Sequence, residues 1–105
     1  MDVTIISRRE SAKREQQAVA KEQSERLTRY FKNIVRIEWH LDDDGTSALV
    51  QCHLHAGHAF YRATTDANNF ESAIHLAADT LIEQRRRKKQ QRVRGRRVPV
   101  LQEVA

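Results

Sequence analysis

Residues 34–55 read IVRIEWHLDDDGTSALVQCHLH, a pattern typical of two β-strands joined by a turn. Before the turn, apolar residues occupy every second position, at Val35, Ile37, Trp39 and Leu41. After the turn, the same spacing recurs at Ala48, Val50, Cys52 and Leu54. Three aspartates and a glycine at 42–45 favour a tight reversal between the two runs. Because successive side chains of a strand point to opposite faces, the hairpin is predicted to have one buried face and one polar face.

Two further strands and a long helix are predicted around this hairpin. The run VTII at 3–6 indicates an opening strand, and a turn at 56–58 precedes a fourth strand with Tyr61, Ala63 and Thr65 facing inward. Residues 10–32 contain no glycine or proline and are rich in good helix formers, which predicts a helix. Its first half is expected to carry few apolar side chains, and the larger ones lie near its end, at Leu27, Tyr30 and Phe31.

A second helix is predicted to start after Asn68 or Asn69, since either side chain can cap it. Its inward face would carry Phe70, Ile74, Ala77, Ala78 and Leu81, and Gly95 and Pro99 are expected to break it. The element order β-α-β-β-β-α predicts an α+β fold of two layers, a four-stranded sheet with two helices packed on one face. We expect a single domain over 1–92 and a flexible tail, first basic and then apolar, over 93–105.

The charge of the chain is concentrated at the end of the second helix. The sequence has a pI of about 9.9 and a formal net charge of +5. Nine basic residues and no acidic residue lie between Arg85 and Arg97, whereas the other ten basic residues share the chain with all fourteen acidic ones. Such asymmetry indicates a polyanionic partner, nucleic acid first and an anionic membrane surface second. The alternative is a solvated charged tail, but the lack of interleaved glutamate after Glu83 favours binding.

The predicted phosphate-binding residues follow from this distribution. On the second helix they are Arg85, Arg86, Arg87, Lys88, Lys89 and Arg92. A second positive element is expected at the end of the first strand and on the first helix, from Arg8, Arg9, Arg26 and Arg29. Lysine and arginine neutralise phosphates and release counterions, so binding is predicted to be sensitive to salt. Ordinary surface charge is the preferred interpretation for Lys13 and Arg14, which have acidic neighbours.

The histidines raise the question of a metal site. His53 and His55 share one face of a strand, with His40 expected on the neighbouring strand and His58 in a turn. Imidazoles on an open sheet face can bind zinc, but no carboxylate is spaced to complete a ligand set. We therefore predict no metal site and no cofactor, and interpret these histidines as surface residues.

No enzymatic motif emerges either, and neither a catalytic residue nor a small-molecule substrate is predicted. Cys52 alternates with apolar residues, which indicates a core thiol rather than a nucleophile. The chain has three glycines and no glycine-rich phosphate loop. With a single cysteine, no signal-peptide pattern and no apolar run of membrane-spanning length, a cytoplasmic protein without membrane contact is expected.

These features together resemble the ribosome hibernation promoting factor family, also known as protein Y or ribosome-associated inhibitor A. The resemblance covers roughly residues 3–90, and its specificity comes from the order and spacing of several weak motifs. The motifs are Val3-Thr4-Ile5-Ile6-Ser7, Leu27-x-x-Tyr30-Phe31, His55-Ala56-Gly57, Asn69-Phe70-x-x-Ala73-Ile74, Asp79-x-Leu81 and Gln84. Basic positions similar to those of the family are kept at Arg26, Arg87 and Lys89.

The chain departs from the family pattern in the second helix. Thr80 and Glu83 stand where the family has basic residues, and Arg85 stands where an apolar residue is usual. The RNA-binding surface of this divergent, short form is therefore expected to lie nearer the carboxyl end of the helix.

The resemblance implies a fold like that of double-stranded RNA-binding domains and a role as a ribosome-associated translation inhibitor. Such a protein would bind the small ribosomal subunit and the intact ribosome through rRNA phosphates, and would occlude the mRNA and tRNA channel under stress. It would be monomeric off the ribosome. Two alternatives stay open: a general structured-RNA-binding module without ribosome specificity, and an interaction protein whose basic arm engages an acidic protein.

Overall fold

The hairpin at 34–55 forms the centre of a four-stranded sheet in the computed structural model of the chain. The structure describes residues 1–7 and 14–97, with residues 88–97 as backbone only. The elements in chain order are β1 (Asp2–Ser7), α1 (Arg14–Leu27), β2 (Ile34–Asp43), β3 (Ala48–Ala56), β4 (Ala59–Ala67) and α2 (Phe70–Arg97). The strands lie in the order β1-β2-β3-β4, with β1 parallel to β2 and the other pairs antiparallel. The predicted element order is thereby confirmed.

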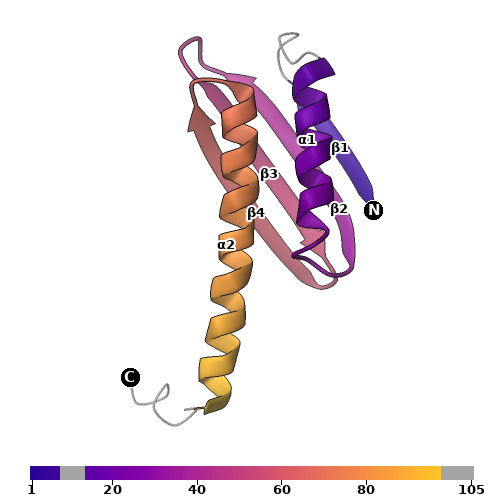
Figure 1. The fold of residues 1–105 in the computed structure, drawn as a ribbon, viewed down its shortest axis with the longest axis vertical. Coiled ribbons are helices and arrows are strands. Elements are labelled where there is room, and N and C mark those ends of the chain that lie inside the picture. Colours follow the sequence, from indigo (N-terminus) through magenta and orange to yellow (C-terminus); the bar gives the residue numbers. More distant parts are fainter. Residues whose placement is uncertain (8–13, 98–105) are drawn as a thin grey trace.

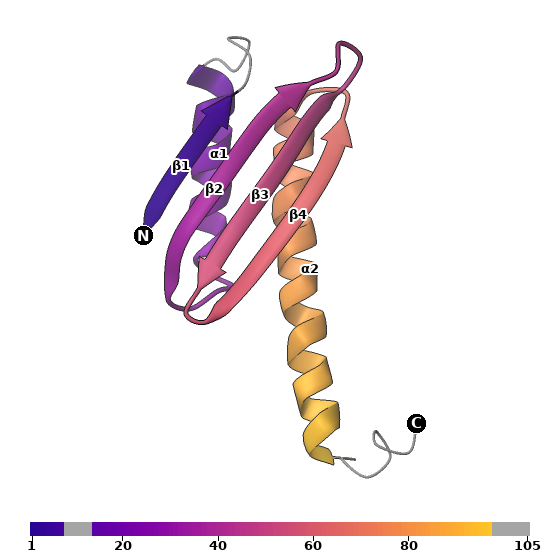
Figure 2. The same ribbon diagram turned by 180° about the vertical axis from the view of Figure 1, so that it is seen from behind.

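Both helices cover the same face of the sheet (Figure 1). Turned by 180°, the molecule shows the opposite face of the sheet with no helix in front of it (Figure 2). A parallel strand pair needs a crossover, and α1 supplies it between β1 and β2. The predicted two-layer α+β architecture is therefore confirmed.

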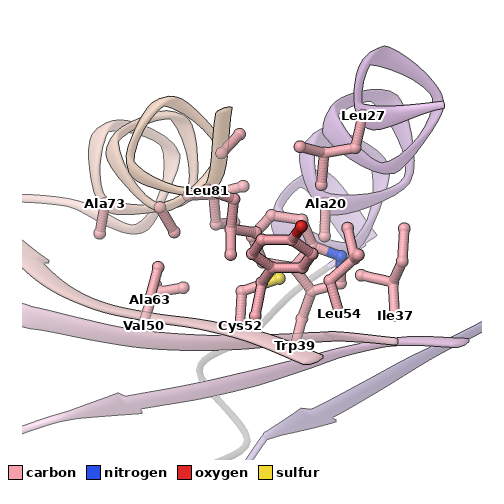
Figure 3. Packing of buried hydrophobic residues seen from close by; sticks show 14 of the residues in the cluster. Ala20, Leu27, Ile37, Trp39, Val50, Cys52, Leu54, Ala63, Ala73 and Leu81 are labelled. Atoms are coloured by element: carbon pink, nitrogen blue, oxygen red, sulfur yellow. The ribbon is translucent and has the colours of Figure 1, made fainter. Parts of the chain in front are cut away.

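The core lies between the sheet and the two helices. Ile37, Trp39 and Leu41 of β2 face inward together with the whole alternating set predicted for β3. Figure 3 shows Ala20 and Leu27 of α1 and Ala73 and Leu81 of α2 packed over these strand residues. Cys52 is fully buried among them, as predicted for a core thiol.

One polar pair is built into this core. The indole Nε1 of Trp39 donates a hydrogen bond to Ser24 Oγ at 2.8 Å, and Ser24 Oγ donates to the carbonyl of Ala20 at 2.8 Å. Trp39 is 0% exposed and Ser24 is 1% exposed. A buried N–H without a partner is costly, so Ser24 at this position satisfies the tryptophan rather than weakening the apolar face of α1.

Two residues predicted to be buried are exposed. Val35 is 57% exposed because the register of β2 against β3 shifts between Ile34 and Arg36, and this irregularity interrupts the alternation. Tyr30 is 44% exposed because α1 ends at Leu27 rather than continuing to Lys32. The predictions for both side chains were wrong.

The second helix is longer than predicted. The expected break at Gly95 is wrong, since α2 continues through it to Arg97. Glycine in a helix costs about 1 kcal/mol relative to alanine but keeps its N–H for the helical hydrogen bond, so it weakens a helix without ending it. The predicted stop at Pro99 and the segment 98–105 lie outside the described residues.

Candidate nucleic-acid interface

The first turns of α2 are anchored firmly to the sheet. Asn69 is the cap, since its Oδ1 accepts a hydrogen bond from the backbone N–H of Ser72 at 2.8 Å. The hydroxyl of Thr65 on β4 donates to the carbonyl of Ala73 at 2.7 Å. The buried residues of the helix recur at helical spacing and are Ala73, Ile74, Ala77, Ala78, Leu81 and Ile82. This half of α2 therefore has a fixed position on the domain.

Beyond Ile82 the helix leaves the domain. Both ribbon views show the carboxyl half of α2 extending past the end of the sheet without another element beside it (Figures 1 and 2). Gln84 marks the departure, because its Nε2 donates to the carbonyl of Arg62 on β4 at 2.8 Å. The basic run of the sequence thus lies on a helical extension whose direction is set by the packed half.

The described arginines on this extension differ in their surroundings. Arg86 and Arg87 are exposed, and the side chain of Arg87 is 73% exposed although its Nε lies 3.6 Å from Glu83 Oε1. Such a surface pair contributes little, so it leaves the guanidinium available to an anion. Arg85 is half-buried beside a hollow of about 300 Å³ that is also lined by Lys32 and His58.

The predicted cations of α1 separate into two kinds. Arg26 Nη1 lies 2.8 Å from Asp79 Oδ1 on α2 and 3.1 Å from Gln23 Oε1, so it bridges the two helices. Arg29 is exposed in the turn after α1, at the end of the domain where α2 leaves the sheet (Figure 1). Of the two, Arg29 is the more exposed.

The structure brings most of the predicted basic residues to one end of the molecule. The turn after α1, which contains Arg29, lies there with the part of α2 that contains Arg85, Arg86 and Arg87 (Figure 1), and the backbone at Lys88, Lys89 and Arg92 continues the same helix. Arg8 and Arg9 lie outside the described residues. Sequence reasoning missed Lys32 and His58, which join this group because the α1–β2 and β3–β4 connections end beside Arg85. Their positions next to predicted turns were the available signal.

As expected, His53 and His55 share one face of β3, and His40 lies on the neighbouring strand β2. His53 is paired with Glu38 across β2 and β3, and His40 lies beside both. The expectation that no carboxylate completes a set is therefore wrong, because Glu38 supplies one. His55 instead packs edge-to-face on the ring of Phe60, with ring centroids 4.6 Å apart.

Among residues 1–7 and 14–97, no helix is both long enough and apolar enough to cross a membrane.

Comparison with known proteins places the chain in a family. The family model described as "Sigma 54 modulation protein / S30EA ribosomal protein" matches residues 3–93. No curated protein sequence matches the chain.

Two solved structures share the fold. A ribosomal subunit interface protein from Coxiella burnetii superposes with a TM-score of 0.74 at 11% identity, over 86% of this chain and 99% of that one. The N-terminal domain of Thermus thermophilus Protein Y superposes with a TM-score of 0.73 at 20% identity, over 83% of this chain and 98% of that one. With the family model covering nearly the whole described domain, the chain belongs to the Sigma 54 modulation protein / S30EA ribosomal protein family.

Proposed function

We propose that this protein is a ribosome-associated translation inhibitor that binds the small ribosomal subunit through rRNA phosphates. It acts by occupying the mRNA and tRNA channel of idle ribosomes under stress, in the cytoplasm, and it carries out no catalysis. Membership of the S30EA ribosomal protein family supports binding to the ribosome. The name of the Coxiella burnetii protein, a ribosomal subunit interface protein, supports a position between subunits.

The observation that carries the proposal is the cationic extension of α2. From Arg85 to Arg97 the helix rises about 18 Å, at about 1.5 Å per residue, and its sequence contains nine basic residues and no acidic one. Like charges on one helix repel one another, and bound phosphates would remove that repulsion. A helix that is fixed at one end and cationic at the other is suited to entering a groove of folded RNA.

The geometry favours recognition of RNA shape over sequence. Arginines form bidentate hydrogen bonds with phosphate oxygens, and phosphate contacts position a protein without reading bases. Lys32 lines the same hollow as Arg85, so a cation from outside α2 adds to those of the extension. Contacts of this kind to phosphates suit double-stranded RNA, which proteins bind largely by its shape.

The experiment is co-sedimentation of the protein with intact ribosomes and with separated subunits, at low and at raised salt. The parent protein is expected to travel with the small subunit and the intact ribosome and to dissociate as salt rises. The double variant Arg86→Glu/Arg87→Glu is expected to stay at the top of the gradient. A matched control, Arg14→Glu/Lys21→Glu, changes the same charge at exposed positions of α1 and should bind like the parent.

A general structured-RNA-binding module is the second candidate, because phosphate contacts alone confer no sequence specificity. Equal affinity for the small subunit and for an unrelated RNA duplex of matched length would favour it. Failure to bind any RNA at low salt would overturn both candidates and favour an acidic protein partner.

A further inference from the structure

The sheet face that the helices leave uncovered carries a cluster of two imidazoles and one carboxylate. Glu38 and His40 project from β2 to this face, because the residues between and beside them, Ile37 and Trp39, face the core. His53 lies directly across from Glu38 on β3. All three side chains thus come from the two central strands of the sheet, whose backbones hold them in register (Figure 2).

The distances in this cluster are close to those of a metal site. His40 Nε2 lies 3.6 Å from Glu38 Oε2, and His53 Nδ1 lies 3.8 Å from the same oxygen. The three residues offer ligand atoms that all lie within 4.8 Å of one another. Tetrahedral zinc with bonds of about 2.0–2.1 Å separates its ligand atoms by about 3.3 Å, so small rotations of the side chains would close the site.

Each of the two imidazoles has a buried ring nitrogen without a hydrogen-bond partner in the described part of the chain. The Nε2 atoms of His40 and His53 are shielded from solvent and have no hydrogen-bond partner there. Buried polar atoms are normally paired, and Nε2 of His40 is the same atom that lies 3.6 Å from Glu38 Oε2, so it points to a missing partner at that place.

The carboxylate is also oriented for the role. Arg36 Nη1 lies 3.3 Å from Glu38 Oε1, whereas the other oxygen, Oε2, is directed at the two histidines. A contact of this kind fixes a ligating carboxylate in metal sites. Arg36 and Arg62 also bring positive charge near the site, which opposes binding of a cation and limits its affinity.

We propose that Glu38, His40 and His53 form a binding site for Zn²⁺, with the fourth coordination position taken by water. Two imidazoles and one carboxylate are a ligand set that suits zinc, and three protein ligands leave an open position. The site lies on the face opposite the helices, so it is independent of the proposed rRNA contacts. Zinc would link β2 to β3 through side chains, in addition to the backbone ladder between the two strands.

The test is titration of the metal-free protein with Zn²⁺ against a chromophoric chelator at neutral pH. We expect one equivalent of Zn²⁺ to bind per chain and to raise the melting temperature. His40→Gln and His53→Gln should each weaken binding by more than the 10–100-fold that loss of a supporting contact typically costs. His58→Gln, which changes an exposed turn histidine outside the cluster, should bind like the parent.

A second measurement does not depend on the variants folding well. Co²⁺ added to the parent protein should give the intense visible absorption of a four-coordinate site, and one equivalent of Zn²⁺ should abolish it. The proposal is overturned if the parent binds no metal under these conditions. It is equally overturned if the His40→Gln and His53→Gln variants bind as tightly as the parent, because the metal would then be held by other histidines.

Discussion

Replacing Ser24 with alanine removes the acceptor for the buried indole N–H of Trp39. The hydrogen bond is 2.8 Å long, and both residues are sealed from solvent. A buried donor left without a partner costs about 1–3 kcal/mol. Alanine returns up to about 0.5 kcal/mol through its higher helix propensity in α1. The expected net loss in the free energy of unfolding is about 1–2 kcal/mol, which corresponds to a fall in melting temperature of roughly 5–15 °C for a domain of this size.

The assay is urea denaturation followed by tryptophan fluorescence. Trp39 is the one tryptophan of the chain and is fully buried, so its emission reports the loss of the core directly. The midpoint should fall while the dependence of the free energy on urea stays unchanged, because the surface exposed on unfolding is nearly the same.

A double-mutant cycle with Trp39→Phe tests the reasoning. Phenylalanine keeps much of the apolar ring but has no N–H, so Ser24→Ala should cost little or nothing in that background, as measured by circular dichroism. The difference between the two backgrounds should be about 1–2 kcal/mol. An equal cost of Ser24→Ala in both backgrounds would refute the argument, because the hydroxyl would then act through something other than the indole.

Three other predictions concern the surface, a histidine and the thiol. Arg86→Ala/Arg87→Ala should reduce the slope of the logarithm of the RNA-binding constant against the logarithm of the salt concentration by about 1.8. The free energy of unfolding, measured by thermal denaturation, should change by less than about 0.5 kcal/mol because both side chains are exposed. Burial lowers the pKa of His53 in the folded protein, so unfolding below the ordinary histidine pKa takes up a proton at this residue. In the presence of a chelator, the free energy of unfolding should therefore be highest above about pH 6.5 and decline as the pH falls below it. His53→Gln should flatten this decline. Burial raises the pKa of the Cys52 thiol, so a disulfide-exchange reagent should label it at the rate of unfolding, and rapid labelling of the native protein would contradict the structure.

Alternation of apolar residues was sufficient to predict the buried face of β3. All four predicted residues are buried there because the pairing with β2 is regular from Ile37 to Asp43. The same rule failed at Val35, where the register shifts by one position. A sequence pattern carries no sign of such a shift, because a bulge is decided by the fit of the two strands rather than by either strand alone.

The carboxylate beside the histidines depends on the length of the hairpin turn. Asp44 closes that turn, with its Oδ1 accepting hydrogen bonds from the backbone N–H groups of Thr46 and Ser47 at 2.9 and 2.7 Å. This closure pairs Glu38 with His53 further along the strands. A turn one residue longer or shorter would pair Glu38 with a different residue and change the face presented there. The three aspartates and the glycine at 42–45 permit several turns.

The basic surface was predictable as composition but not as geometry. The purity of the run after Glu83 indicated a polyanion partner from the sequence alone. The engagement of Arg26 by Asp79 could not be inferred, because the two residues are distant in sequence and meet through the packing of α1 on α2. Charge counts treat Arg26 and Arg29 alike, whereas the fold pairs the first and exposes the second.

The continuity of α2 separates the residues that hold the domain together from the residues that carry charge. Among the side chains of α2 that the structure describes, Ile82 is the last buried one, and those that follow it contribute little to the core. Amino-acid changes at the exposed positions of the extension therefore alter the electrostatic potential of the protein with little effect on its free energy of unfolding. Such a segment can gain, lose or shift cations over evolutionary time while the sheet and the first turns of the helix stay fixed. Divergence of this segment can then change the charge of the protein independently of its fold.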